Sequence, residues 1–246
     1  MIFKLLACET FTREICACMA DVPHGIDLDF TAIDSHDHPE TLRNEIQERI
    51  DGVERAGRAY DAILLCYGLC GNAAAGIVAR STQLVIPRAH DCCTVLLGSK
   101  KLFRRYFEKC PSQSFLSRGH LERGSEAHVH HAWAQDRRQR RALYAKLYGE
   151  ANADHLLAAM TGPDTGKVVY INIRPTESRE CIQRCREKAV REKKEYVQLE
   201  GGLSLIRNLM SGNWYTEDFL VVRPGRTIAG VYDWETVMEA TEAGGS

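Results

Sequence analysis

The 246-residue sequence lacks long hydrophobic runs, and it lacks an excess of either charge. Its longest apolar run is far shorter than the roughly 20 residues that an α-helix needs to cross a bilayer, so we predict no membrane-spanning helix. Basic and acidic residues number 32 and 33, which gives a formal net charge of -1. This balance provides no general attraction to nucleic acid or to an anionic membrane surface. We therefore expect neither nucleic acid nor a membrane as a partner.

The N-terminal segment lacks the features of an export signal. It has neither a charged leader nor a long apolar stretch, although Leu5-Leu6-Ala7-Cys8 has the chemistry of a lipoprotein cleavage site. We interpret this segment as a first strand and expect a cytoplasmic protein. In a reducing cytosol, the ten cysteines are expected to be free thiols or metal ligands.

Short apolar runs alternate with amphipathic segments along most of the chain, and the length of the runs is typical of buried strands. We expect strands at 2–7, 26–33, 62–65, 84–86, 167–173, 196–199 and 219–222. Helices are expected at 10–20, 39–55, 73–79, 91–109, 178–193 and 202–210. This alternation predicts an α/β, Rossmann-like fold of parallel sheet flanked by helices. The sequence leaves open whether there is one broad sheet or two similar lobes.

Changes in composition divide the chain into three parts. Residues 1–123 form an N-terminal α/β lobe, residues 124–166 a helical insert or linker, and residues 167–239 a C-terminal α/β lobe. The insert contains a histidine cluster and a basic run, which we interpret as solvated helix faces, at His128, His130, His131 and 137–141. The C-terminal part is expected to contain a hairpin that begins at Pro224-Gly225 and a frayed tail at 240–246.

Thiols and an imidazole follow three of the predicted strands, at Cys8, Cys70, His90 and Cys92. In an open α/β sheet, ligands bind outside the carboxyl ends of the strands. Thiolate and imidazole together suit zinc or an iron–sulfur centre and do not suit magnesium or calcium. We therefore predict that these four residues are metal ligands. Because they come from separate strand ends, the pattern favours a catalytic centre with an open coordination position over a zinc ribbon.

Four further residues are candidates for supporting roles. Glu9 and Asp91 adjoin the predicted ligands and are expected to orient them or to transfer protons. Gly71 and Asn72 are expected to open a helix, whose free N–H groups would bind an anionic cofactor or lower the pKa of Cys70.

The alternative to the metal hypothesis is that these cysteines are ordinary core residues, because free cysteine is among the residue types most often buried in protein cores. Cys66 and Cys93 are expected to be core residues. Four further cysteines are assigned to helices: Cys16, Cys18, Cys181 and Cys185.

Several motifs resemble an uncharacterised prokaryotic family that is known only as a domain of unknown function. They are Ala7-Cys8-Glu9 followed by Thr12-Arg13-Glu14, Tyr67-Gly-Leu-Cys-Gly-Asn72, and Ile86-Pro-Arg-Ala-His-Asp-Cys92 followed by Leu96-Leu-Gly-Ser-Lys100. Looser similarity extends to Tyr148-Gly-Glu-x-Asn152 and to Phe219–Gly225. By this resemblance, the motif positions are occupied by Cys8, Cys70, His90, Asp91 and Cys92. The resemblance also implies a setting, because genes of the family often adjoin those of corrinoid-dependent methyltransferases.

The resulting hypothesis is a cytoplasmic zinc protein of corrinoid-linked one-carbon metabolism, acting on a small-molecule substrate beside a corrinoid protein or methyltransferase. Such an enzyme would transfer a methyl group or activate a thiol or hydroxyl acceptor by Lewis-acid chemistry. Two alternatives remain open. One is an iron–sulfur enzyme that uses the same cysteines. The other is a non-catalytic accessory protein that carries a metal or tetrapyrrole or docks to a methyltransferase.

Overall fold

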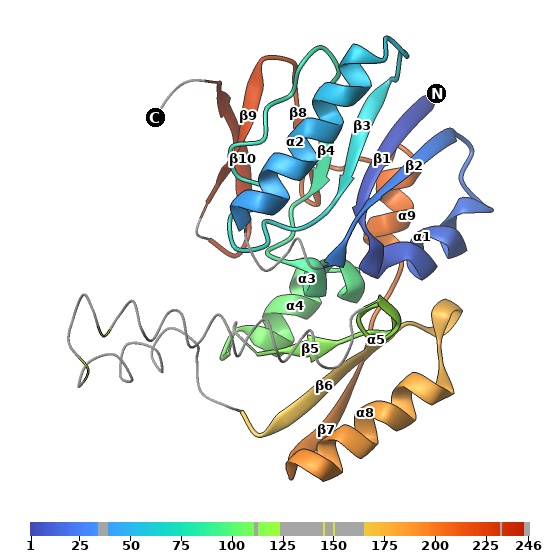
Figure 1. Ribbon diagram of the computed structural model, residues 1–246, viewed down its shortest axis with the longest axis vertical. Helices are drawn as coiled ribbons and strands as arrows, with labels where there is room; N and C mark the ends of the chain where they lie inside the picture. The colour runs from blue at the N-terminus through green and yellow to red at the C-terminus, as the bar shows by residue number, and fades with distance from the viewer. Residues whose placement is uncertain are drawn as a thin grey trace.

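The computed structural model describes residues 1–33, 39–110, 113–123, 145, 150, 165–231 and 233–243. These residues form two α/β layers, which lie one above the other in Figure 1. The large sheet has the strand order β2-β1-β3-β4-β8 and is parallel except for β8. Its strands are β1 (Ile2–Cys8), β2 (Gly25–Thr31), β3 (Ala62–Cys66), β4 (Leu84–Pro87) and β8 (Phe219–Val222). The predicted α/β fold with a parallel sheet flanked by helices is confirmed.

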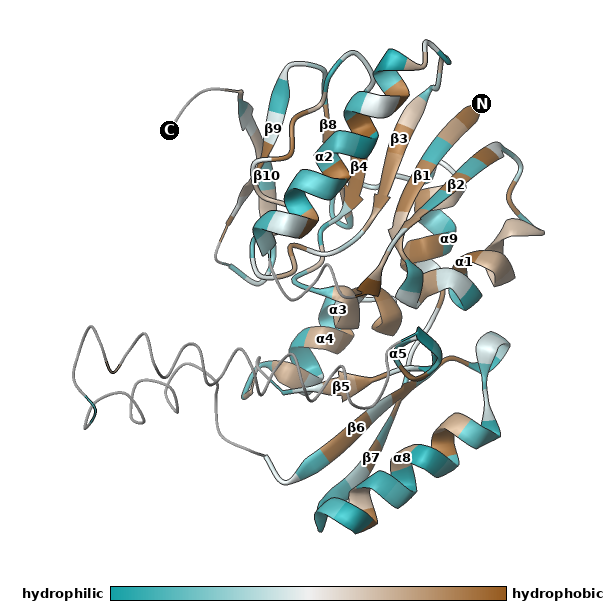
Figure 2. Cartoon of the chain, viewed as in Figure 1, coloured by the Kyte–Doolittle hydropathy of each residue, from teal (hydrophilic) through white to brown (hydrophobic). Residues whose placement is uncertain are grey.

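The core lies on both faces of the large sheet, because β3 and β4 are buried along their whole length. Helix α2 (Pro39–Arg55) covers one face and turns Leu42, Ile46 and Ile50 inward, a spacing that places all three on one side of a helix. Figure 2 shows apolar strands enclosed by helices whose outer surfaces are hydrophilic. Away from α2, helix α1 (Thr12–Met19) packs against helix α9 (Ser204–Met210). A 3-10 turn, η1 (Glu9–Phe11), precedes α1.

The small sheet has the order β5-β6-β7 and is entirely parallel. Its strands are β5 (Phe115–Leu116), β6 (Lys167–Asn172) and β7 (Glu195–Glu200). The accompanying helices are α5 (Arg118–Arg123), η3 (Arg174–Thr176) and α8 (Arg179–Glu192). Strand β5 therefore belongs with the small sheet, whereas α9 and β8 return to the large one. Each layer is therefore built from segments that are not consecutive in sequence. This arrangement differs from the two predicted lobes, which were the consecutive segments 1–123 and 167–239.

The expected helix over 91–109 is two helices, α3 (Cys92–Leu97) and α4 (Lys100–Phe107). Gly98 ends the first in the left-handed conformation, with φ of 71°, and the Ser99 hydroxyl caps the second by accepting a hydrogen bond from the Leu102 N–H. The expected helix at 73–79 was wrong, because that segment consists of turns and bends with one isolated bridge at Val78.

The C-terminal segment also differs from the expectation. The turn at Pro224-Gly225 leads into β9 (Arg226–Gly230), which pairs antiparallel with β10 (Met238–Glu242). Residues 240–242 therefore belong to a strand and not to a frayed tail. The histidine cluster, the basic run and most of the predicted insert lie outside the described residues.

The carboxyl ends of the parallel strands of the large sheet face the small sheet (Figure 1). The contact between the layers is close: a Cβ atom on Gly119 would overlap the carbonyl of Thr10, and one on Gly201 would overlap the carbonyl of Leu96. Across the same contact, the Thr176 hydroxyl donates to Oε1 of the buried Glu14 over 2.7 Å. The second layer therefore covers the strand ends.

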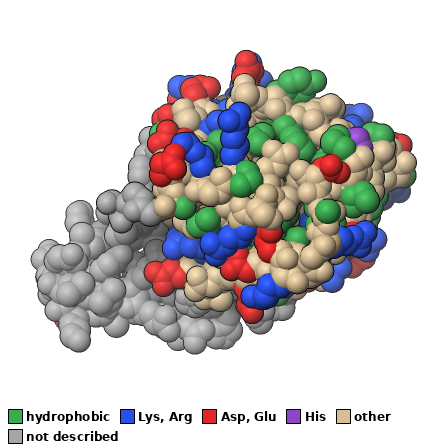
Figure 3. All heavy atoms as spheres, turned by 90° about the horizontal axis from the view of Figure 1, so that it is seen from above, with side chains coloured by type: hydrophobic (Ala, Val, Ile, Leu, Met, Phe, Trp, Pro, Cys, Tyr) green, Lys and Arg blue, Asp and Glu red, His purple; other side chains and the backbone are tan. Residues whose placement is uncertain are grey.

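The outer surface carries charges of both signs, interspersed over the face shown in Figure 3. Among the described helices, none combines the length and the apolar character that a bilayer crossing requires.

Glu14 makes the stability depend on pH. Burial raises the pKa of this carboxyl, because water no longer solvates its charged form, and Oε2 has no hydrogen-bond partner in the described chain. Because the pKa of Glu14 is higher in the folded state than in the unfolded state, Glu14 contributes its full stabilisation at pH values below the unfolded pKa. This stabilisation is lost as pH rises through the folded pKa. We expect Glu14→Gln to reduce this loss, so that its free energy of unfolding gains on the wild type as pH rises in urea titrations.

Glu122→Gln is the control with the opposite sign. Partial burial acts to raise the pKa of Glu122, but hydrogen bonds from Arg13 and Arg118 lower it overall. This variant should lose stability relative to the wild type as pH rises from the folded pKa of Glu122 to its unfolded pKa, and the difference should be constant above the unfolded pKa. Parallel pH profiles for Glu14→Gln and the wild type would contradict the assignment.

Candidate functional site

Three cysteines lie at the carboxyl ends of three neighbouring parallel strands. Cys8 is the last residue of β1, Cys70 follows β3, and Cys92 follows β4. The order β2-β1-β3-β4 makes the gap between β1 and β3 a topological switch point, because the chain winds in opposite directions from these two strands. Ligands of open α/β sheets bind at such points, outside the carboxyl ends. We call Cys8, Cys70 and Cys92 the thiol rim.

The loops after β3 and β4 continue to pair beyond the strands. The N–H of Leu69 donates to the carbonyl of Ala89 over 2.8 Å, and the N–H of Cys70 donates to the carbonyl of His90 over 2.9 Å. Gly68 allows this approach, because a Cβ at that position would lie 2.6 Å from the Cα of Asp91. The pairing brings Cys70 beside the start of α3, where Cys92 is located.

The turn at Cys70 has an unusual backbone. Cys70, Gly71 and Asn72 all have positive φ, at 47°, 64° and 72°. Such angles are uncommon for residues with a Cβ, and they are maintained by surrounding contacts, here including the bond of 2.8 Å from Arg43 Nη2 to the Asn72 carbonyl. The chain forms turns here and no helix begins. Gly71 and Asn72 therefore do not provide the helix N-terminus that the sequence had predicted.

The thiols of the rim are protonated at neutral pH. Burial raises the pKa of Cys8, raises that of Cys70 to about 12, and raises that of Cys92 well above its usual value. The thiols act on one another in the same direction, since Cys70 and Cys8 add to the effect of burial on Cys92. The prediction of a lowered Cys70 pKa was therefore wrong, and the free thiols are weak nucleophiles.

The two predicted acid–base residues differ in their surroundings. Glu9 is held by other groups: Oε1 accepts from the Ile33 N–H over 2.9 Å, and Oε2 lies 3.7 Å from an Arg123 nitrogen. Asp91 caps α3 by accepting from the Thr94 N–H over 3.1 Å. Burial raises the pKa of Asp91 to about 6, so this carboxyl exchanges its proton close to neutral pH. Asp91 fits the predicted proton-transfer role better than Glu9 does.

The His90 ring is directed toward the loop between β9 and β10. It stacks on Phe103 with 5.2 Å between ring centroids and makes a tilted contact with Trp234 at 5.1 Å. Its Nε2 lies 3.1 Å from the Asp233 carbonyl oxygen. Burial lowers the pKa of His90, which keeps the imidazole neutral. The buried Nδ1 has no hydrogen-bond partner within the described ranges.

The side-chain arrangement does not form a ready metal site. In the described ranges, no three Cys, His, Asp or Glu side chains are grouped so that they could hold one ion. The Cys8 thiol instead donates to the Thr10 hydroxyl over 3.1 Å.

The other cysteines lie where the sequence suggested. Cys66 and Cys93 are fully buried in the main core, and Cys181 and Cys185 are buried in the core under α8. Cys16 is exposed on α1, whereas Cys18 on the same helix is buried.

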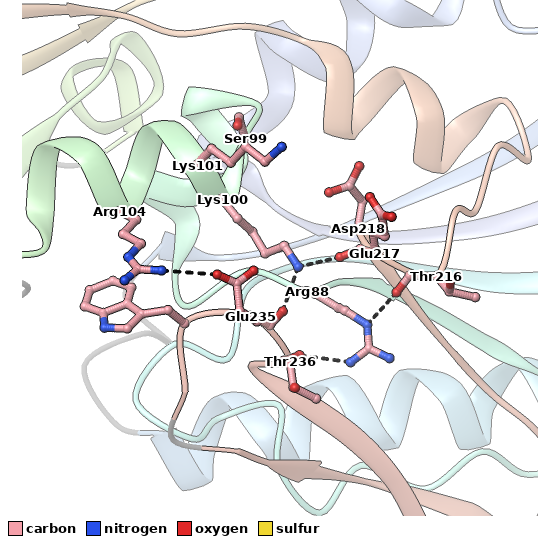
Figure 4. Close-up of a pocket in the computed structure, with 11 residues that line it drawn as sticks. Arg88, Ser99, Lys100, Lys101, Arg104, Thr216, Glu217, Asp218, Glu235 and Thr236 are labelled. Atoms are coloured by element: carbon pink, nitrogen blue, oxygen red, sulfur yellow. Dashed lines mark hydrogen bonds and ion pairs between the residues drawn. The ribbon is translucent and has the colours of Figure 1, made fainter.

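Sequence reasoning missed a pocket of about 640 Å³ on the other side of the β4 exit (Figure 4). Arg88 and Lys100 line it, together with residues of α4 and of the β9–β10 loop. Both residues lie within the motifs quoted above, in Ile86–Cys92 and Leu96–Lys100. The presence of these two basic residues inside the motifs was the available signal.

These features define a class: an α/β protein with one buried and two part-buried thiols at the switch point of its main sheet and a pocket with four basic residues beside it. A family model described as "Protein of unknown function (DUF1638)" matches residues 30–210. The chain belongs to this family. The matched region includes Cys70, His90 and Cys92, whereas Cys8 precedes it. No match was found among curated proteins or among solved structures.

Gly68→Ala tests the close approach of the two loops. The added methyl would meet the backbone of Asp91, which is not free to move, so we expect a loss of about 1–3 kcal/mol in unfolding free energy, typical of overpacking. Gly52→Ala is the matched control, because Gly52 lies within α2 and a Cβ there meets nothing closer than 3.9 Å. That variant should gain about 0.5–1 kcal/mol from helix propensity. Equal effects in urea denaturation would contradict the described contact.

Proposed function

We propose that the thiol rim binds a thiophilic metal ion, with zinc as the first candidate, and that the protein acts in corrinoid-linked one-carbon metabolism. The observation that carries the metal proposal is the convergence of three thiols at the carboxyl ends of β1, β3 and β4. The metabolic setting, including a corrinoid protein or methyltransferase as partner, rests on the family resemblance alone.

The chemistry of the three side chains supports a cation in this place. Thiolates are ligands for zinc and iron–sulfur centres, and they form only when something compensates for burying their charge. The raised pKa values of the three thiols indicate that no protein group does so. Binding an ion requires the Cys8 sulfur to exchange its hydrogen bond with Thr10 for a bond to the metal.

The surrounding residues have separate roles in this proposal. Asp91, whose pKa of about 6 lies near neutrality, would receive or supply a proton beside Cys70 and Cys92. Glu9 would hold the loop after β1 by its bond to the Ile33 N–H. His90 would reach the ion only after leaving Asp233, so we assign it no ligand role. Zinc held here would supply Lewis-acid activation of a thiol or hydroxyl acceptor in transfer to a small-molecule substrate.

Two alternatives use the same residues. An iron–sulfur cluster would be held by the three thiolates and would leave one iron open to substrate. The other alternative is a non-catalytic carrier of a metal or tetrapyrrole that docks to a methyltransferase. One observation favours it: the pocket of Figure 4 has no cysteine among its described lining residues, so it does not place a substrate against the thiol rim as an enzyme would require.

The first test is the metal content of four variants purified without oxygen. Cys70→Ser and Cys92→Ser should each lose the metal, whereas Cys181→Ser and Cys185→Ser should retain it, because the latter pair is buried in the core of the other layer. Elemental analysis gives the result. Zinc in colourless protein supports the leading assignment, and several irons in brown protein support the cluster. Equal metal content in all four variants, or none in the wild type, would remove the site.

The second test is the pH dependence of zinc affinity. Each thiol must lose its proton on binding, so below the thiol pKa values the dissociation constant should fall about tenfold per pH unit for each coordinating thiol. Competition with a chelator at about pH 6 to 8 measures this slope. Cys8→Ser should reduce the slope by one proton, whereas Cys16→Ser, on the exposed side of α1, should leave it unchanged. An affinity that does not vary with pH would exclude thiolate ligation.

A further inference from the structure

A second site lies on the opposite side of the β4 exit, where four basic residues surround the pocket of about 640 Å³. We call it the cation pocket and define it by Arg88, Lys100, Lys101 and Arg104. Figure 4 shows it between the start of α4, the turn before β8 and the loop between β9 and β10. Its volume is within the range of sites for small metabolites.

Within the described residues, Arg88 and Lys100 form no ion pair with a carboxylate and bind backbone carbonyls instead. Nε of Arg88 donates to the Thr216 carbonyl over 2.9 Å, and Nη1 donates to the carbonyls of Thr236 and Met238. Nζ of Lys100 donates to the carbonyls of Glu217 and Glu235. In the described chain, Nη2 of Arg88 and the third proton of Lys100 have no hydrogen-bond acceptor. Each side chain therefore keeps one donor for a ligand.

The three acidic residues of the pocket, Glu217, Asp218 and Glu235, attract Lys100 electrostatically but form no ion pair with Lys100 or Arg88. Glu235 pairs with Arg104 at 3.2 Å. Figure 4 shows the carboxylates of Glu217 and Asp218 pointing away from the ends of Arg88 and Lys100. Partial burial lowers the pKa of both basic groups, as expected where the charge lacks full compensation.

We propose that the cation pocket binds a small metabolite through an oxyanion group, a carboxylate or a phosphate, held by Arg88 and Lys100. A guanidinium and an ammonium group donate charge-assisted hydrogen bonds to such oxygens, and these bonds are about twice as strong as neutral ones. Trp234 supplies an apolar wall for the rest of the ligand, and its ring is fixed by contact with His90 and Phe103. The proposal goes beyond the metal site and does not depend on it.

The test is calorimetric titration of the full chain with inorganic phosphate and with glutarate, against potassium chloride at equal ionic strength. Binding of phosphate alone assigns a phosphate ligand, binding of glutarate alone assigns a carboxylate, and binding of both supports a general oxyanion site. Tryptophan fluorescence in a Trp133→Phe, Trp214→Phe background, where Trp234 is the remaining tryptophan, provides a second signal from within the pocket. Heat and fluorescence no different from those with potassium chloride, up to about 10 mM of either anion, would overturn the proposal.

Variants locate the binding. Lys100→Gln and Arg88→Gln remove a charge but keep N–H donors for the carbonyls, and each should weaken binding at least tenfold. Arg105→Gln is the matched control, because Arg105 is exposed on the same helix and does not line the pocket. If both pocket variants fail to fold, Arg88→Lys replaces them, since it keeps a cation but removes the guanidinium nitrogen that is available to the ligand, and it should also weaken binding. Affinity in the folded pocket variant equal to that of Arg105→Gln would contradict the proposal.

One further variant separates this proposal from the metal site. Cys70→Ser should bind the anion as the wild type does, because no described cysteine lines the pocket. Loss of metal with retained anion binding, or the reverse, identifies which of the two proposals has failed. Loss of anion binding in folded Cys70→Ser would contradict the independence of the two sites.

Discussion

The close parallel pairing of the chain after β3 and β4 is the constraint on which the rest of the structure depends. The ladder continues past both strands through the N–H groups of Leu69 and Cys70, and Gly68 lets one backbone approach the other at Asp91. This pairing aligns Cys70 with the start of α3. The second layer then covers the same edge through glycines that allow its loops to contact the strand ends. Cys8 is buried at this edge, whereas Cys70 and Cys92 remain part-buried.

Burial determines what chemistry the thiols can perform. A thiol used directly as a nucleophile needs a nearby positive charge that lowers its pKa, and such thiols are at least partly exposed. The rim thiols have the opposite surroundings: other thiols and the Asp91 carboxylate act with burial to raise the pKa values of Cys70 and Cys92. A group of mutually destabilised thiolates is converted into a stable arrangement by a cation that all of them contact. The electrostatics therefore disfavour covalent catalysis by a single rim cysteine and support the metal proposal.

The sequence predicted the strands and the cysteines at their ends because those features are local. Apolar runs of limited length and the turn residues after them identified β1, β3 and β4, and parallel pairing then follows from the strand–helix alternation. The orientation of His90 was not predictable, because it is set by Phe103 and by a loop more than 140 residues away. The return of β8 to the large sheet is similarly non-local, and nothing in Phe219–Val222 itself distinguishes the two sheets.

The loop between β9 and β10 explains why basic residues gather beside the β4 exit. Val237 has φ of 60°, an unfavourable conformation for a β-branched residue, and Asp233 maintains it by accepting hydrogen bonds from the N–H groups of Glu235, Thr236 and Val237. The loop carbonyls that result point at Arg88 and Lys100, which bind them. Carbonyl dipoles satisfy hydrogen bonds but do not cancel a full charge, and the nearby carboxylates compensate the charges of Arg88 and Lys100 only in part. The segment from Arg88 to Cys92 thus lies between two regions of opposite chemistry. In the cation pocket, the positive charges are only partly compensated, whereas at the thiol rim the surroundings disfavour negatively charged thiolates.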